Sequence, residues 1–449
     1  MSPSLPIEMI EHALSFLDGD AKTLAACSLM CRALLPACRT LLWRRIVIEE
    51  SYDTRDREEL EKLSEVRAFN PQIFPYVRSF TLLCTRRYNS CDVSVNYGID
   101  YCMIFPNIRS LTLDGLIQSP LTWLLSLTDS IPTLEEFHLR NVWPIDPYAS
   151  LPVDEFPESL GPLKQLMRTP SSDGIGEEPM RPRLHTFSIV NSQSFNPWSA
   201  SELPELVSSL ERSKWLSTLR SLELRIGVNC GSSMAGWGPD ATIHSKPHLR
   251  VPSFVPQLTH FGIAINHFVR LAGYVEGPTT RESMQYIFSD LVRCSGLRSL
   301  CLQTYCSTAS GWVDQDGLHL PARVEKPKLP PIFFDELCNF LGAPGSPAFP
   351  ALERLSLVFL NPLNWLWESG RAFERLAHVC LETDDSGRRR YPELRHLDIH
   401  VMIAGFVRRP FPSDLEEART VFERDRDDIV LSMLAPFVQG GIAVEVATV

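Results

Sequence analysis

A short apolar pattern recurs nine times between residues 75 and 399, and it constrains the fold more than any other feature of the sequence. It reads Pro-x-Leu-x-x-Leu-x-Leu, with other apolar residues replacing leucine and the proline missing from some copies. Apolar and polar residues alternate in the second half of each copy, which predicts a β-strand that begins just after the proline. The copies are residues 75–82, 106–113, 132–139, 182–189, 219–224, 256–263, 297–302, 350–357 and 392–399.

Helix-like segments separate these copies. They are residues 120–131, 201–215, 280–294, 332–341, 365–381 and 413–437. The last segment opens with a capping box from Ser413 to Glu416. A tenth strand is expected at residues 442–446, after Gly440 and Gly441. Strands that alternate with helices predict an α/β fold in which about ten parallel strands have helices on the outside.

The first 48 residues differ from the repeats and predict three short helices. A helix that begins at Pro6 places apolar residues over about half of its circumference, which is more than the roughly 100° that an ordinary surface helix needs. Gly19 and Asp20 end this helix, a second apolar helix contains Leu24, and Pro36 opens a third. Because so small a helical core is only marginally stable alone, part of the apolar surface is expected to contact a partner.

The spacing of residues in this segment resembles the F-box, particularly the form found in the large fungal F-box families. The matching positions are Leu5-Pro6-x-Glu8-x-Ile10, Asp20, Leu24, Ser28-Leu29-x-Cys31-Arg32 and Leu42-Trp43-Arg44. The resemblance implies a helical module that binds the small Skp-type adaptor of cullin-based ubiquitin ligases. The residues expected to face the adaptor or the module's core are Leu5, Pro6, Ile10, Leu14, Leu24, Cys31 and Leu34.

The nine copies resemble an irregular leucine-rich repeat. Their spacings of 26 to 55 residues mostly exceed the usual 20 to 29, and the asparagine ladder is missing, so the resemblance depends on the strand pattern. The expected domains are an F-box-like module at residues 1–48, a helical connector at 49–74 and a leucine-rich-repeat-like solenoid at 75–449. Long loops at 168–182 and 227–256 absorb part of the extra length, and the second, with Trp237, His244 and His248, is either a binding loop or a surface insertion.

Polar residues between the repeated leucines are expected to share the concave face of the solenoid, because side chains alternate along a strand. Serine and threonine dominate this face in the first half of the chain, whereas charged residues and histidines dominate it in the second half. The second half is therefore the better candidate for recognising a partner. The candidate partner-binding residues are His260, Arg354, His396, Asp398 and His400.

Catalytic and cofactor motifs are missing from the sequence. There is no G-x-S-x-G, H-E-x-x-H, P-loop or dinucleotide-binding motif, so we expect no enzymatic activity and no cofactor. His396, Asp398 and His400 share one strand face and have the donor types of an iron site, but polar residues at these positions follow from the repeat itself. Cys27, Cys31 and Cys38 are better explained as core thiols than as zinc ligands.

Composition limits which partners and which cellular compartment are expected. The net charge is −11 and no long basic run occurs, so neither nucleic acid nor a membrane is an expected partner. No signal peptide or long apolar segment is recognisable, and the twelve cysteines are spread along a large chain. The expected localisation is therefore cytoplasmic or nuclear.

Two functional hypotheses follow from the sequence. In the first, the chain is the substrate-receptor subunit of an SCF-type ubiquitin ligase, which binds a Skp-type adaptor, and through it a cullin, and presents a target protein. In the second, the chain is a non-catalytic scaffold whose F-box-like helices only cap the solenoid. Leu34, which stands where many F-box relatives have tryptophan, favours the second hypothesis.

Overall fold

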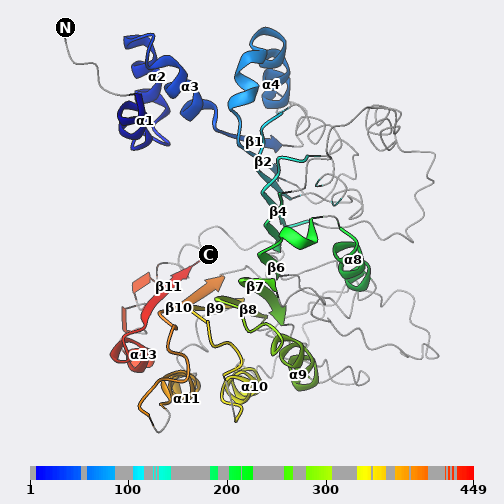
Figure 1. Ribbon diagram of the computed structural model, residues 1–449, viewed down its shortest axis with the longest axis vertical. Coiled ribbons are helices and arrows are strands. Elements are labelled where there is room, and N and C mark those ends of the chain that lie inside the picture. Colours follow the sequence, from blue (N-terminus) through cyan, green and yellow to red (C-terminus); the bar gives the residue numbers. More distant parts are fainter. Residues whose placement is uncertain are drawn as a thin grey trace, which may run out of the picture. The chain divides into compact units, whose positions relative to one another are not determined.

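Eleven strands in the described part of the chain form one parallel sheet, and their order in the sheet is their order in the sequence (Figure 1). The chain divides into two compact units, Met1–Phe187 with Ser213–Thr218 and Ser188–Arg212 with Leu219–Val449. The computed structural model describes residues 7–51, 58–85, 105–115, 125, 128, 131–142, 183–190, 202–213, 215–225, 257–265, 280–305, 331–344, 347–360, 370–383, 386–402, 420, 423–424, 427–428 and 432–448.

The first unit begins with three short helices, as the sequence predicts. They are α1 (Ile7–Ser15), α2 (Ala21–Met30) and α3 (Leu35–Trp43). Gly19, at a φ of 93°, turns the chain between α1 and α2 in a conformation that favours glycine. Asp20 caps α2 by accepting hydrogen bonds from the Thr23 backbone N–H at 3.0 Å and the Thr23 hydroxyl at 2.6 Å. These bonds lower the pKa of the Asp20 carboxyl.

Five strands follow in this part of the chain: β1 (Arg45–Ser51), β2 (Ser79–Thr85), β3 (Ser110–Asp114), β4 (Glu136–Arg140) and β5 (Thr186–Val190). The boundary between the units falls within β5. The connector contains α4 (Glu58–Phe69) and the 3-10 helix η1 (Pro71–Tyr76). The sequence did not predict β1, which pairs with β2 along seven residues and extends across the expected boundary after residue 48.

Aromatic side chains form the core behind these strands. Phe80, Phe137 and Phe187 occupy the second position of β2, β4 and β5 and are fully buried, while Leu111 occupies this position in β3. Trp215, which precedes the 3-10 helix η5 (Leu216–Thr218), lies 5.6 Å from Phe187 between ring centroids. Its indole N–H donates to the Thr128 hydroxyl at 2.7 Å, so the buried polar group of this large side chain is satisfied.

In the described part of the second unit, helices separate most of the successive strands. Its helices are α8 (Glu202–Glu211), α9 (Thr280–Leu291), α10 (Pro331–Leu341), α11 (Gly370–Leu381) and α13 (Ala435–Gln439). Figure 1 shows α9, α10, α11 and α13 along one side of the strands. The strands are β6 (Ser221–Arg225), β7 (His260–Ile265), β8 (Ser299–Tyr305), β9 (Arg354–Leu360), β10 (His396–Met402) and β11 (Ala443–Thr448).

The core of the second unit is also rich in phenylalanine. Phe333 and Phe334 of α10 contact Phe359 of β9, and Phe373 of α11 completes the cluster at 4.9 Å from Phe334 between ring centroids. All four rings are buried. Both α10 and α11 therefore pack against β9 through side chains larger than leucine.

All ten strands predicted from the sequence are present, and the α/β class with parallel strands is confirmed. The expected helices at 201–215, 280–294, 332–341 and 365–381 correspond to α8, α9, α10 and α11. Leu125 and Thr128 are helical, as expected, and α13 lies at the end of the expected 413–437 helix. The capping box at Ser413, the loop at 168–182 and the loop at 227–256 lie outside the described residues.

A recurring hydrogen-bond arrangement joins the starts of neighbouring strands. The carbonyl of the residue just before one strand accepts backbone N–H bonds from two successive residues at the start of the next. The Arg78 carbonyl accepts from Arg109 and Ser110, and the Arg298 carbonyl accepts from Glu353 and Arg354. The same bifurcated bond occurs at the carbonyls of Arg44, Arg109, Glu135, Arg220, Thr259 and Glu353.

Candidate functional site

The three N-terminal helices share a small core. Leu14, Leu24, Ala37 and Cys38 are buried together, and only two of these four side chains are larger than cysteine. The side chains packed partly against this core are Ile10, Leu17, Cys27, Leu34, Leu41 and Leu42. We call residues 7–43 the helical module. Because its core is small, little of its apolar surface is used internally.

Four large apolar side chains of the module are exposed. They are Met9 (58% exposed), Phe16 (78%), Leu29 (88%) and Met30 (79%). Met9 and Phe16 belong to the broad apolar face predicted for the first helix. Burying such side chains in an interface contributes about 1.5–3 kcal/mol each, so this surface can drive association.

The structure divides the predicted adaptor-binding residues between core and surface. Leu14 and Leu24 are buried, Ile10 and Leu34 are partly buried against the core, and Cys31 is exposed. Leu5 and Pro6 lie outside the described residues. Leu29 and Met30 were not chosen from the sequence, although at 100° per residue both lie more than about 90° from Leu24 on the helix circumference. That angular position was the signal that could have found them.

The helical module also contacts the rest of its unit. α3 contacts η1 and β1, and α4 contacts the same two elements. The module is therefore attached through its third helix, while the exposed residues Met9, Phe16, Leu29 and Met30 belong to α1, α2 and the turn between them.

A second candidate surface is the sheet face that carries the polar positions of β6 to β10, here called the polar face. Register places its residues in rows across the strands. The first row is Ser221, His260, Ser299, Arg354 and His396. The second row is Glu223, Gly262, Cys301, Ser356 and Asp398, and the third contains Ala264, Gln303, Val358 and His400. The structure thus brings His260, Arg354 and His396 into one row, Asp398 into the next and His400 into the third.

Asp398 is the centre of one polar network on this face. Its side chain is only 8% exposed, accepts a hydrogen bond from the Ser356 hydroxyl at 2.7 Å and lies 3.4 Å from Nε of Arg354. A buried carboxylate is costly unless it is paired in this way. The buried Asp398 carboxylate therefore fixes one edge of the Arg354 guanidinium. The Arg354 side chain itself is half-exposed.

Arg225 forms a second network with Glu223 and Gln303. Its Nε lies 3.0 Å from the Glu223 carboxylate, and its Nη1 donates to the Gln303 side-chain oxygen at 3.5 Å. Gly262 makes this arrangement possible, because a Cβ atom at that position would lie 2.5 Å from Cγ of Glu223. The glycine leaves the space through which the Glu223 side chain crosses β7.

Two histidines of the polar face favour the neutral form. Burial lowers the pKa of His260; Glu223 opposes this effect, whereas Arg225 and Arg354 add to it. Burial also lowers the pKa of His400, opposed by Asp398. Nδ1 of His400 is buried and has no hydrogen-bond partner among the described residues.

Exposure differs sharply between the rows of the polar face. Arg354 and His396 of the first row are exposed, whereas Asp398, Gln303 and Val358 of the inner rows are buried. Burial also raises the pKa of the Cys301 thiol to about 12, so that the thiol remains protonated and unreactive at neutral pH. The accessible part of the surface is therefore the first row, at the starts of the strands.

The metal hypothesis gains no support from the geometry. Within the described ranges, no group of three or more histidine, cysteine, aspartate or glutamate residues is placed to hold a metal ion. Asp398 is instead engaged by Arg354 and Ser356.

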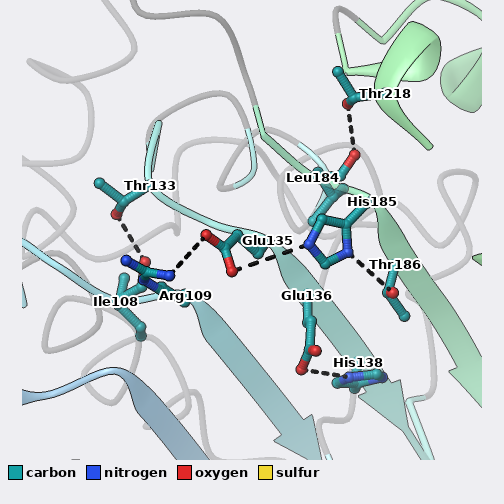
Figure 2. Close-up of polar contacts among 10 residues, drawn as sticks. All are labelled: Ile108, Arg109, Thr133, Glu135, Glu136, His138, Leu184, His185, Thr186 and Thr218. Carbon is teal, nitrogen blue, oxygen red and sulfur yellow. Dashed lines mark hydrogen bonds and ion pairs between the residues drawn. The ribbon is translucent and has the colours of Figure 1, made fainter. Parts of the chain in front are cut away.

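Figure 2 shows a third polar cluster, at the starts of β3, β4 and β5 in the first unit. The Glu135 carboxylate lies 3.3 Å from Arg109 and 4.0 Å from His185, and His138 lies 3.8 Å from Glu136. Sequence reasoning missed the position just before each strand, which is charged or histidine in most copies. The signal was present at Arg78, Arg109, Glu135, His185, Arg220, Arg298, Glu353 and Arg395.

Comparisons with known proteins identify no family. A scan against models of protein families finds no match, and a search of curated proteins finds no significant similarity. The fold itself defines the class as an α/β protein with a parallel sheet. In the part of the chain that the structure describes, no helix is both long and apolar enough to cross a membrane.

Proposed function

We propose that the chain is the substrate-receptor subunit of a cullin-based SCF-type ubiquitin ligase. The observation that carries this proposal is the exposed apolar surface of the helical module at Met9, Phe16, Leu29 and Met30. It occurs in the segment whose residues resemble an F-box, on three helices with a small core. A Skp-type adaptor that covered this surface would complete the module's apolar burial.

In this proposal the chain contributes binding and no chemistry. The helical module binds the adaptor, and through it the cullin, while the strands and helices that resemble leucine-rich repeats hold a target protein. Holding the target beside the activated ubiquitin raises the effective concentration of its lysines, which accelerates transfer by other subunits. An adaptor interface of about 1,600 Å² would be of ordinary size for such a complex.

The second candidate function is a scaffold whose helical module caps the first strand. The contacts of α3 with β1 and η1 favour it, because a cap must cover the end of a repeat array. Leu34 in place of tryptophan also favours it. The two candidate functions differ in one respect: a cap does not require that Phe16 and Leu29 be exposed to water, whereas an adaptor-binding surface does.

Co-expression with a Skp-type adaptor followed by size-exclusion chromatography tests the proposal. The informative variant is Phe16→Ser with Leu29→Ser, since both side chains are more than three quarters exposed and their loss spares the core. Ile10 is a poorer choice because it packs against that core. The matched control is Phe69→Ser, which removes an exposed phenylalanine from α4.

We expect the wild type and the control to co-elute with the adaptor and the double variant to elute alone. A folded wild-type chain that elutes without the adaptor would contradict the receptor assignment and favour the cap. Equal loss in the control would show that the association is unspecific.

A further inference from the structure

The starts of the strands in the second unit form a cationic surface on an acidic protein. Parallel strands begin at the same edge of a sheet, so the two residues at each strand start lie at one edge. Four of these residues are arginines and one is glutamate, although the whole chain has a net charge of −11. The residues are Arg220, Ser221, Thr259, His260, Arg298, Ser299, Glu353, Arg354, Arg395 and His396.

Arg354 has the geometry to receive a carboxylate. Its Nε faces the buried Asp398 at 3.4 Å, and its terminal nitrogens Nη1 and Nη2 have no ion-pair or hydrogen-bond partner among the described residues. The side chain is 50% exposed. A guanidinium held at one edge presents its other nitrogens as a fixed pair of donors, which matches a carboxylate.

Two further donors flank Arg354 in register. Ser299 on β8 and His396 on β10 are its direct neighbours in the first row, so their side chains share its face. Adjacent strands lie about 4.8 Å apart. An extended peptide that lies across the strand starts can therefore contact these three side chains in succession.

Among the described residues, the neighbouring arginines are held by exchangeable ion pairs. Arg298 lies 3.1 Å from Glu353, and Arg395 lies 3.1 Å from Glu393. Both arginines are well exposed, at 63% and 71%, and their partners are about half-exposed. Exposed pairs of this kind stabilise a protein very little, so exchanging them for a partner's carboxylates costs little.

Nearby acidic groups favour a carboxylate over a phosphate. Asp398 lies beneath Arg354, and Glu353 and Glu393 accompany the flanking arginines. A phosphate group carries up to two negative charges at neutral pH, but each of these arginines already has one carboxylate beside it, so the second charge gains little net attraction over a singly charged carboxylate. The charge balance therefore fits a glutamate or aspartate side chain.

We propose that the surface formed by Ser299, Arg354 and His396, with Arg298 and Arg395 beside it, binds a segment rich in glutamate or aspartate in a partner protein. One carboxylate of that segment binds Arg354 end-on. The inference rests on the proposed function in one respect only, namely that the partner is the protein presented for ubiquitination.

Fluorescence anisotropy with the full chain and a labelled oligoglutamate peptide tests this site. An oligoglutamine peptide of the same length controls for backbone binding, and a phosphoserine-containing peptide tests the choice of anion. The variants are Arg354→Gln and the pair Arg298→Gln with Arg395→Gln. Arg371→Gln, which removes an exposed arginine from α11, is the control of equal charge change for the single variant. Arg67→Gln with Arg371→Gln is the corresponding control for the pair.

We expect Arg354→Gln to weaken oligoglutamate binding at least about tenfold, because it removes the bidentate donor. The flanking pair should weaken binding about three- to tenfold and reduce its dependence on salt. The control variants should stay within about twofold of the wild type.

Three results would overturn the proposal: wild-type binding no stronger than to oligoglutamine, equal weakening in the controls, or tighter binding of the phosphoserine peptide at the same residues. Because this assay contains no adaptor, its failure leaves the co-elution result standing. Failure of co-elution likewise leaves the peptide site to be judged by its own data.

Discussion

The helical module and the second unit use apolar residues in opposite ways. The module buries Leu14, Leu24, Ala37 and Cys38 and leaves Phe16 and Leu29 in water. The described part of the second unit buries most of its large aromatic side chains, and four of them form a cluster between α10, α11 and β9. A region with a small core and large apolar side chains in water has surface left for association.

The comparison between the module and the second unit shows which residues contribute to stability and which are available for binding. In the second unit, β7 to β10 each have a neighbouring strand on both sides, so the core repeats from strand to strand. The helical module has no such repetition, and its third helix, α3, contacts β1 of the sheet. Substitutions of buried residues should therefore act on stability, and substitutions of the exposed apolar residues of the module should act on association.

The largest effect is expected from Phe373→Ala. The ring is fully buried against Phe334 and Phe359, so its removal leaves a large cavity and should lower the free energy of unfolding by about 3–5 kcal/mol. Urea unfolding of the second unit measures this change. Phe69→Ala, which removes an exposed ring, should change the free energy by about 0.5 kcal/mol or less. Similar losses in both variants would contradict the assigned core.

Leu24→Ala should act on the helical module alone. The side chain is 1% exposed, and its loss should cost about 2–3 kcal/mol, the lower part of the usual range, because a small core can close around a cavity. Hydrogen exchange of α1 to α3 is the measurement, and protection of α10 and α11 should not change. If the adaptor binds, adding it at about 100 times its dissociation constant should restore about 2.7 kcal/mol. Loss of protection in both regions would show that the module is not a separate stability element.

Asp398→Asn should have a moderate effect. The substitution keeps an acceptor for the Ser356 hydroxyl but removes the charge opposite Arg354, so we expect a loss of about 1–2 kcal/mol. Chemical unfolding measures the loss. Glu353→Gln, which removes a half-exposed carboxylate paired with Arg298, is the control and should cost about 0.5 kcal/mol or less. An increase in stability for Asp398→Asn would mean that the buried charge is poorly compensated.

The smallest effect is expected at mildly acidic pH. Burial lowers the pKa of both His260 and His400, so the unfolded chain binds protons more readily than the folded chain. Their contribution to stability is therefore present above a pH of about 6.5 and is lost as the pH falls through the lowered folded-state values. Comparing the wild type with His260→Gln and His400→Gln measures this slope. The double variant should flatten it, and an unchanged slope would exclude these histidines as its source.

The strands could be predicted from the sequence because a buried strand face requires apolar residues at regular spacing. Leu222, Phe261, Leu300, Leu355 and Leu397 stand at the same position of successive strands, and register aligns them as expected. β1 was missed because Arg45–Ser51 follows a helix directly, without a preceding Pro-x-Leu signal. β1 forms by pairing with β2, and the local sequence of β1 does not reveal this long-range contact.

The candidate sites were less predictable, because alternation assigns a face but not an exposure. His260, Arg354, His396 and Asp398 all lie on the expected face, yet Asp398 is buried and His396 is exposed. This difference in exposure depends on neighbouring side chains that are far apart in the sequence. Similarly, the helical period of α1 identified an apolar half but could not divide it between the core at Leu14 and the surface at Phe16.

The bifurcated carbonyls at the strand starts have a consequence for how such a chain can vary. Each of them aligns two neighbouring strands at a single point, whatever the length of chain between them. Sequence can therefore be inserted or deleted between copies without changing which residues face one another across the sheet. Alignment is renewed at every strand, so an array of this kind can accumulate very unequal connections and still present one continuous, ordered set of side chains.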